Sequence, residues 1–227
     1  RRDLIQDDRA HPGLPDHGRV DGFDIPAWQP DPSSGPQQSP TNPLETSYFC
    51  VIDKDGNLFS ATPSDPTISG DVVPGLGITT SRWGTRAHTG AHHPARVGPG
   101  WRPRMSADPM LAMKPGEAMI PIGSPGSEVL GQAQLQAMVN MLIFGMSPQA
   151  AVEAPRFASY SWPASALPHT SHPARLNLEE VIGADVGEAL SDRGHDIAWW
   201  PKWIWRAGSV CIICLDQKSG ILQGAAD

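Results

Sequence analysis

The sequence changes character at Thr46, and this boundary constrains the fold more than any other feature. Residues 13–45 show little apolar periodicity and become rich in proline, serine and glutamine toward their end, which is typical of a linker that buries no core. Residues 48–52 are then strand formers, residues 53–57 have turn chemistry, and residues 58–61 favour a second strand. The sequence therefore predicts a β-hairpin that begins abruptly at a threonine.

The rest of the chain indicates a mixture of strands and helices. Two strands are expected within 110–122, and a long helix is expected over 128–144, where apolar residues recur at helical spacing. Those residues are Val129, Leu130, Leu135, Met138, Val139, Leu142 and Ile143. Shorter helices are expected over 147–154 and 184–193. Four tryptophans near the end are expected to pack against a partner subunit rather than to stack on substrate: Trp199, Trp200, Trp203 and Trp205.

Composition argues against several classes of function. The chain has 227 residues and a net charge of −7, and the lack of a basic run argues against nucleic-acid binding. No apolar run approaches the roughly 20 residues that a membrane span needs. Cys211 and Cys214 form a C-x-x-C, but they fall in an apolar run that favours a buried strand over a zinc or redox site. His92 and His93 have no partner at ligand spacing, so no metal or other cofactor is expected.

Several short motifs follow Thr46 in order. They are Pro-Gly-Trp-Arg-Pro at 99–103, Gly-Ser-Pro-Gly-Ser at 123–127, Glu-Ala-Pro-Arg-Phe at 153–157, Gly-Ser at 208–209 and Gly-Ala-Ala-Asp at 224–227. The first three resemble Pro-Gly-Lys-Arg-Pro, Gly-Ser-Pro-Gly-Gly and Asn-Ala-Pro-Arg-Phe of the γ-glutamyltransferase family. The resemblance covers about residues 46–227, and the ordered set makes it specific.

The resemblance implies an N-terminal nucleophile hydrolase, an α+β protein with a four-layer α/β/β/α sandwich. In that family the precursor cuts itself before the threonine that opens the small subunit. Residues 1–45 would then be the tail of the large subunit plus the proline-rich linker, and residues 46–227 the small, catalytic subunit. The partner would be the large subunit from the same precursor, in a heterodimer or a dimer of heterodimers. The compartment stays open, with the cytoplasm favoured over the periplasm.

Thr46 is the candidate nucleophile. A threonine hydroxyl needs a base, and the free α-amine of the same residue, with an ordinary pKa of about 7.7–8.0, can serve as one. This chemistry requires the nucleophile to be the first residue of a mature chain, and it fits the lack of a legible Ser-His-Asp constellation. The alternative is that Thr46 only starts a strand, but the downstream motifs favour the catalytic role.

The family pattern implies further catalytic residues around Thr46. A hydroxyl residue eighteen positions after the nucleophile supports it, and Ser64 holds that place here. The oxyanion that forms on carbonyl attack needs two fixed N–H donors, which the resemblance assigns to the backbone of Gly126 and Ser127. Where the family has a substrate-binding asparagine, this chain has Pro66, and the adjacent Asp65 is a candidate substitute.

The expected substrate departs from the γ-glutamyl group. The pair of serines that binds the α-carboxylate in the family is Met105-Ser106 here, so only Ser106 keeps the hydroxyl. The acid that binds the α-ammonium is missing from residues 80–86, which instead contain Arg82 and Arg86. An arginine would repel an ammonium and suits a carboxylate. The sequence therefore predicts a small, anionic amide such as oxamate, in line with a resemblance to the oxamate amidohydrolase branch.

Two alternatives remain open. One is an ordinary γ-glutamyltransferase or glutathione hydrolase that recognises glutamate through other residues, mainly of the large subunit. The other is an unprocessed, non-catalytic homologue that serves as a binding protein. In either enzymatic case the partners are a small-molecule amide and the large subunit, with no nucleic acid and no membrane span.

Overall fold

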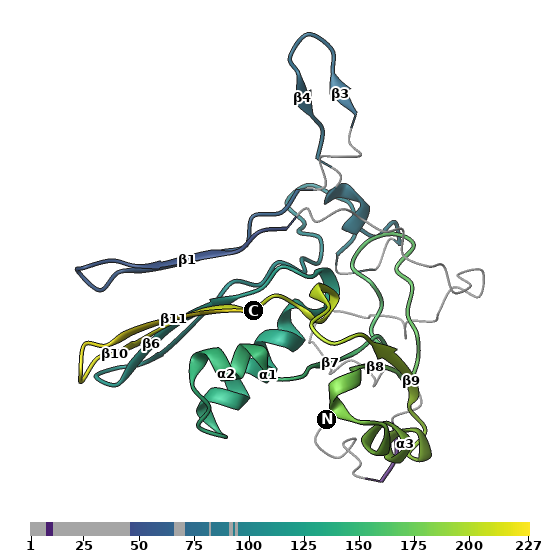
Figure 1. The fold of residues 1–227 in the computed structure, drawn as a ribbon. Coiled ribbons are helices and arrows are strands. Elements are labelled where there is room, and N and C mark those ends of the chain that lie inside the picture. Colours follow the sequence, from purple (N-terminus) through teal and green to yellow (C-terminus); the bar gives the residue numbers. More distant parts are fainter. Residues whose placement is uncertain (1–7, 11–45, 66–70, 82, 91–92, 94) are drawn as a thin grey trace, which may run out of the picture.

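The described part of the chain includes the hairpin after Thr46 and extends to the last strand (Figure 1). The computed structural model describes residues 8–10, 46–65, 71–81, 83–90, 93 and 95–227. The linker expected over 13–45 and the position of Pro66 therefore lie outside the described residues. Among the helices of the described part, none is long and apolar enough to cross a membrane.

A four-stranded antiparallel sheet forms the centre of the molecule, in the order β11-β10-β6-β5. The strands are β5 (Met110–Lys114), β6 (Ala118–Gly123), β10 (Cys211–Asp216) and β11 (Leu222–Ala226). The two strands predicted within 110–122 are confirmed as β5 and β6. Ile122 pairs with Ile212 on the neighbouring strand, and both side chains are buried in the main core. The C-x-x-C lies on β10, as the apolar run predicts, and both of its cysteines are free.

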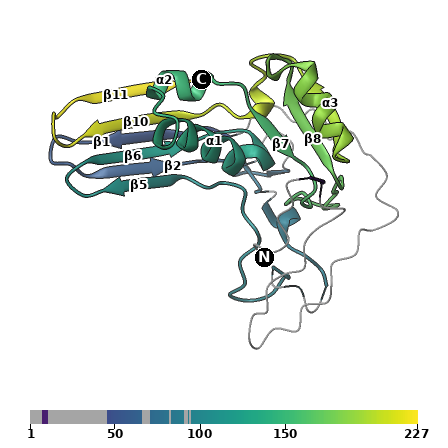
Figure 2. The ribbon, with the colours of Figure 1, turned by 90° about the horizontal axis from the view of Figure 1, so that it is seen from below.

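Two helices cover one face of this sheet (Figures 1 and 2). The first is α1 (Leu130–Leu142), and the second is α2 (Pro148–Glu153), which Ser147 caps by accepting a hydrogen bond from the N–H of Ala150. Ala133 and Ala137 of α1 and Val152 of α2 pack into the same core as the isoleucines of the sheet. Small alanines on α1 let the helix approach the sheet closely.

The buried face of α1 differs from the predicted stripe. Its buried residues are Leu130, Ala133, Gln134 and Ala137, at the i, i+3, i+4, i+7 spacing of one helix face. Leu135, Leu142 and Ile143, which belong to the predicted apolar stripe, are 62%, 59% and 73% exposed. The prediction relied on the large apolar side chains, whereas the helix packs on the sheet through the adjacent face, where Ala133 and Ala137 are small.

The predicted hairpin forms a further layer on the sheet. It consists of β1 (Phe49–Ile52) and β2 (Leu58–Ala61); both strands contact β6, and β1 also contacts β10. Figure 1 shows the hairpin on the side of the sheet opposite to α1 and α2. The described residues therefore supply a helix layer, a sheet and a two-stranded layer.

A smaller, three-stranded sheet lies beside this core. It contains β7 (Phe157–Ser159), β8 (Arg175–Glu179) and β9 (Asp196–Trp200), with β8 and β9 parallel. The parallel pair is connected through η4 (Glu180–Ile182) and α3 (Ala184–Asp192), so the helices predicted over 147–154 and 184–193 are both observed. Of the four clustered tryptophans, Trp200 is buried, whereas Trp199, Trp203 and Trp205 remain exposed.

Short elements complete the fold. A second hairpin, β3 (Val72–Val73) and β4 (Ile78–Thr79), projects from the rest of the molecule (Figure 1). Three short 3-10 helices, η2 (Trp83–Arg86), η3 (Ser127–Val129) and η5 (Trp205–Ala207), lie where chain segments meet.

Candidate active site

Thr46 and Ser64 form a hydroxyl pair at the base of the first hairpin. They face each other in an isolated antiparallel bridge, and their Oγ1 and Oγ atoms are 2.8 Å apart. The N–H of Ser47 donates to the carbonyl of Pro63 at 3.0 Å, which continues the pairing. The structure thus brings together the two hydroxyls that the sequence assigned to nucleophile and support, eighteen residues apart.

The hairpin is fixed to the sheet by Tyr48. Its ring lies against Gly123, where a Cβ atom would come within 2.0 Å of the tyrosine Cε2, so any side chain at Gly123 would displace the ring. The Tyr48 hydroxyl lies 2.8 Å from Oγ of Ser60 on the returning strand. Burial raises the pKa of the Tyr48 phenol above its ordinary value, which keeps it protonated for this hydrogen bond. Tyr48 therefore connects the strand of Thr46 to the first residue of the Gly-Ser-Pro-Gly-Ser motif.

The turn at the end of this motif contains the two candidate oxyanion donors. Gly126 has φ 129° and ψ 25°, a backbone conformation that side chains rarely adopt, and a Cβ there would lie 3.2 Å from the Cα of Gly208. Ser127 instead opens the helix η3, where the backbone is helical and suits any L-residue. The serine that replaces the family's second glycine therefore stands where a side chain is allowed.

Ser124 and Arg156 hold residues 207–209, the segment against which Gly126 lies. Oγ of Ser124 accepts a hydrogen bond from the N–H of Ser209 at 2.9 Å, and Ser124 is fully buried. Arg156, only 3% exposed, donates to the carbonyls of Ala207 at 2.9 Å and Gly208 at 3.0 Å. The same guanidinium reaches the carbonyl of Val152 and the carboxylate of Asp227. The Ala-Pro-Arg-Phe motif thus supplies a structural arginine.

A group of charged and hydroxyl side chains, which we name the Arg86 cluster, lies near the same turn. It consists of Arg86, Arg104, Ser106, Glu128 and Ser165. Nη1 of Arg86 donates to Oγ of Ser106 at 3.0 Å and also to Oγ of Ser165. Two residues predicted to bind substrate, Arg86 and Ser106, are therefore in contact.

Glu128 is the only carboxylate in the Arg86 cluster. Its Oε2 accepts from Nη2 of Arg104 at 2.8 Å, and its Oε1 accepts from the N–H of Ser165 at 2.8 Å and lies 3.8 Å from Nη1 of Arg86. Two guanidiniums against one carboxylate leave one positive charge in excess. Burial lowers the pKa of Arg86, partly offset by Glu128 and reinforced by Arg104, yet a guanidinium stays charged at neutral pH.

Trp83 connects the cluster to the nucleophile pair. The guanidinium carbon of Arg86 lies 4.1 Å from the centre of the Trp83 ring, a cation–π geometry. At its other edge, the indole N–H donates to the carbonyl of Ser64 at 2.7 Å. A continuous set of contacts therefore runs from Thr46 through Ser64 and Trp83 to Arg86.

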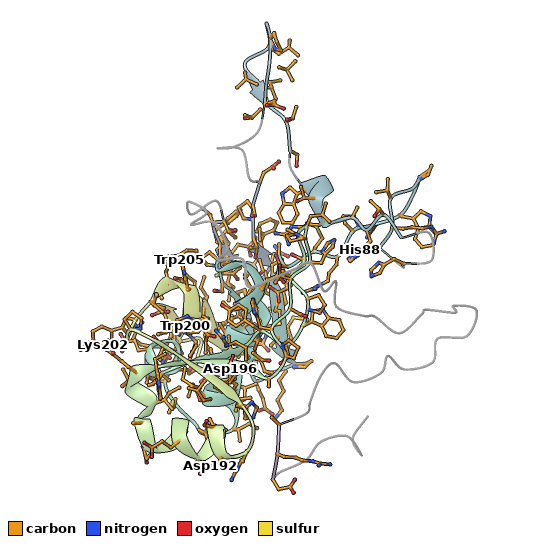
Figure 3. The ribbon with its side chains drawn as sticks, turned by 90° about the vertical axis from the view of Figure 1, so that its right-hand side faces the viewer. His88, Asp192, Asp196, Trp200, Lys202 and Trp205 are labelled. Atoms are coloured by element: carbon orange, nitrogen blue, oxygen red, sulfur yellow. The ribbon has the colours of Figure 1, made fainter. Side chains whose placement is uncertain are left out.

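Three imidazoles stack next to this region. The ring of His88 lies between His93 and His169, with centroid distances of 3.5 Å and 3.8 Å. Figure 3 shows His88 on the side of the molecule away from Trp200 and Trp205. Burial, with the nearby His169, His93 and Arg104, lowers the pKa of His88 to about 4. Across the described part of the chain, no group of three or more His, Cys, Asp or Glu side chains is arranged to hold a metal ion.

Two predicted site residues remain. Asp65 is exposed beside Ser64, and Arg82 lies outside the described residues, as does His92, which was not expected to bind a metal. Sequence reasoning missed Trp83, Arg104, Glu128 and Ser165 as site residues. A usable signal existed for Glu128, because an acid directly follows the two candidate oxyanion donors, but nothing local indicated that it would meet arginines more than twenty residues away.

A protein-family model described as gamma-glutamyltranspeptidase matches residues 1–227. The chain is 34% identical over 187 residues to the Acylase ACY 1 proenzyme of Pseudomonas sp. (strain V22), a match covering 80% of this chain and 30% of that protein. It is 28% identical over 185 residues to the Glutathione hydrolase proenzyme of Bacillus subtilis (strain 168), covering 81% and 29%. The chain thus spans about 30% of the length of the curated relatives that it matches.

The fold is also similar to that of a solved acylase. The structure of cephalosporin acylase from Bacillus halodurans superposes with a TM-score of 0.66 at 29% identity, and the match covers 79% of this chain and 32% of that chain. These values describe the superposition as a whole, so the similarity concerns the fold and not single site residues.

Proposed function

Because the chain belongs to the γ-glutamyltranspeptidase family, we propose that it is the catalytic part of a self-processing amidohydrolase with Thr46 as its nucleophile. The observation that carries the proposal is the hydroxyl pair of Thr46 and Ser64, 2.8 Å apart, at the start of the predicted strand. In this proposal residues 46–227 form the small subunit, and residues 1–45 belong to the large subunit and the linker. The large subunit completes the four-layer α/β/β/α sandwich, of which the described residues supply three layers.

The precursor first cuts itself. The Thr46 hydroxyl attacks the carbonyl carbon of Glu45, the acyl group moves from nitrogen to oxygen, and water hydrolyses the resulting ester. This frees the α-amine of Thr46, which then takes the hydroxyl proton during attack on a substrate amide. Ser64 keeps the Thr46 hydroxyl oriented through their hydrogen bond.

The substrate amide is cleaved in two steps. Attack by Thr46 forms a tetrahedral oxyanion, which the N–H groups of Gly126 and Ser127 stabilise. The C–N bond then breaks, the amine leaves with the proton held by the α-amine, and an acyl ester remains on Thr46. Water hydrolyses this ester by the same proton transfers and regenerates the enzyme.

The Arg86 cluster favours an acyl group that ends in a carboxylate and has no ammonium. Its excess positive charge lies beside the Ser106 hydroxyl, which accepts from Arg86 at 3.0 Å and so keeps its own proton to donate to a carboxylate oxygen. Asp65 is a further candidate contact, exposed beside Ser64. Oxamate remains the predicted model substrate, and the relative named an acylase supports an acyl amide as the substrate class.

A second candidate is a glutathione hydrolase. Relatives carry that name, and Glu128 provides a carboxylate near Arg86 that the segment 80–86 lacks. Against it, both Glu128 oxygens already accept hydrogen bonds from Arg104 and Ser165, which leaves little capacity for an ammonium.

The test uses the full-length precursor. Intact mass should give two chains for the wild type and for Thr46→Ser, which keeps a hydroxyl, but one uncut chain for Thr46→Ala. Incubation of the processed enzyme with a panel of amides should then add an acyl mass to the chain that begins at Thr46. Cleavage that persists in Thr46→Ala would overturn the nucleophile assignment. A higher kcat/KM for γ-glutamyl-p-nitroanilide than for every carboxylate-ended amide would favour the second candidate.

A further inference from the structure

Trp83 makes two different contacts, one through an edge and one through the face of its rigid ring system. Its indole N–H is hydrogen-bonded to the main-chain carbonyl of Ser64 at 2.7 Å. Its aromatic face supports the Arg86 guanidinium at 4.1 Å. A tryptophan has only two side-chain torsions, so the two contacts together fix the orientation of one rigid indole ring.

The first contact bears on the nucleophile. Ser64 holds Thr46 through its side chain, while its carbonyl is held by Trp83. If the indole N–H is lost, the carbonyl loses a hydrogen bond and the peptide is free to rotate. That rotation would move the Ser64 hydroxyl relative to Thr46.

The second contact bears on the substrate end. The guanidinium carbon of Arg86 lies over the Trp83 ring, so the ring supports one face of the guanidinium and leaves its N–H groups available to acceptors beyond the ring. In this orientation Nη1 of Arg86 reaches Oγ of Ser106. Without the ring, the guanidinium would keep its charge but lose the support of its face.

We propose that Trp83 is a positioning residue that sets the distance between the nucleophile and the charged end of the substrate. The inference rests on the proposed function, because it assumes acylation of Thr46 and a carboxylate at the Arg86 cluster. Because one rigid ring spans both contacts, the enzyme accepts one acyl chain length best. Amides whose acyl chains are shorter or longer by one methylene fit worse.

The test separates the two contacts with two variants of the full-length enzyme. Trp83→Phe keeps an aromatic face for Arg86 but has no N–H for Ser64, whereas Trp83→Leu has neither. Trp101 gives a matched control, since the Arg96 guanidinium lies 3.7 Å from its ring centre and neither residue belongs to the Arg86 cluster. kcat and KM are measured for a carboxylate-ended acyl amide, for its carboxamide analogue, and for a series differing by one methylene.

Trp83→Phe should lower kcat about tenfold for both amides, as expected for one lost hydrogen bond, and leave the ratio of their KM values within about twofold. Trp83→Leu should lower kcat similarly and also raise KM about tenfold for the carboxylate-ended amide alone. It should also flatten the chain-length preference. Trp101→Leu should change neither kcat nor the ratio of the two KM values, and it should leave the chain-length preference as it is. The inference is overturned if Trp83→Phe leaves kcat unchanged, if both variants shift the KM ratio equally, or if Trp101→Leu has the same effects.

A binding measurement keeps the inference testable if the enzymatic proposal fails. Should the wild type neither process itself nor acylate Thr46, the proposed function is rejected, and calorimetric binding of glutarate is read instead. Glutarate that binds about tenfold more weakly to Trp83→Leu, but normally to Trp83→Phe, would support the role of the ring at Arg86. Equal binding by all three proteins, or no binding by the wild type, would overturn it.

Discussion

Arg156 and Arg86 both meet a carboxylate, yet they lie in different surroundings. Arg156 is 3% exposed, and its donors reach the carbonyls of Val152, Ala207 and Gly208 and the carboxylate of Asp227. The Arg86 side chain is 16% exposed, and its partners among the described residues are two serine hydroxyls, one aromatic face and a more distant carboxylate.

The difference lies in what the acceptors can do next. A main-chain carbonyl can only accept a hydrogen bond and cannot donate one to a ligand. An arginine whose donors bind such carbonyls therefore stabilises the fold. A serine hydroxyl that accepts from an arginine still has a proton to donate, so the arginine can act on a ligand through it. We therefore interpret Arg156 as a structural residue and Arg86 as a residue of the substrate site.

The largest expected effect tests the structural half of this comparison. Arg156→Met leaves the Asp227 carboxylate without its partner and three buried carbonyls without a donor. The free energy of unfolding should fall by about 3–5 kcal/mol, measured by urea denaturation of the full-length protein. A loss below about 1 kcal/mol would contradict the structural role. Leu135→Ala, at an exposed position of α1, serves as the control.

The next effect concerns the turn at Gly126 and Ser127, which lies against Gly208, one of the residues that Arg156 binds. Ser127→Pro removes one candidate oxyanion donor at the first position of η3, where proline is tolerated, and should lower kcat by about 10²–10³. Ser127→Ala keeps the N–H and should change kcat little. Equal and severe losses in both variants would assign the role to the Ser127 hydroxyl instead. Melting temperatures of both variants should be measured, so that a folding defect is recognised.

A smaller effect follows from acidification near Arg86. The pKa of His88 is lowered to about 4 from an ordinary 6.5, so the unfolded chain takes up this proton first as pH falls. The contribution of neutral His88 to the free energy of unfolding is complete above about pH 6.5, and it is lost as the pH falls from 6.5 toward 4. Amide exchange, corrected for intrinsic rates, should therefore rise more in residues 85–90 than in α1. His88→Phe should remove the pH dependence, whereas a uniform rise in both regions would contradict it.

The smallest effect tests the other half of the comparison. Arg86→Met leaves Glu128 paired with Arg104 at 2.8 Å, so no carboxylate is stranded. We expect the free energy of unfolding to change by about 1 kcal/mol or less, while KM for a carboxylate-ended amide rises relative to its neutral analogue. A stability loss as large as that of Arg156→Met would remove the distinction between the two arginines.

Local signals in the sequence predicted much of the fold. The hairpin after Thr46, the pair β5 and β6, and helices α1, α2 and α3 each follow from residues that are close in the sequence, through strand formers, turns and caps. Thr46 and Ser64 came together as the family spacing implied. The buried face of α1 was mispredicted, because packing against the sheet favours its small side chains.

The Arg86 cluster could not be predicted in the same way. Arg86 and Ser165 are 79 residues apart, and Arg104 and Glu128 are 24 apart; irregular segments bring them together, and no periodicity describes such segments. Residues 80–86 contain no acid, and nothing in that segment indicated which carboxylate lies beside Arg86. The structure supplies it from Glu128, directly after the Gly-Ser-Pro-Gly-Ser motif.

The outer face of the first hairpin bears on how such a chain has to be made. Phe49, Val51 and Phe59 are 50%, 48% and 53% exposed, and a strand face of this kind invites association with other chains. In the proposed precursor, the ribosome makes the large subunit first, so we expect that subunit to be available to cover the hairpin when the hairpin emerges. A chain started at Thr46 would reverse that order, and its hairpin would meet other copies of itself before it met its partner. Self-cleavage after folding would therefore give Thr46 its free amine without requiring the hairpin to be synthesised before the large subunit.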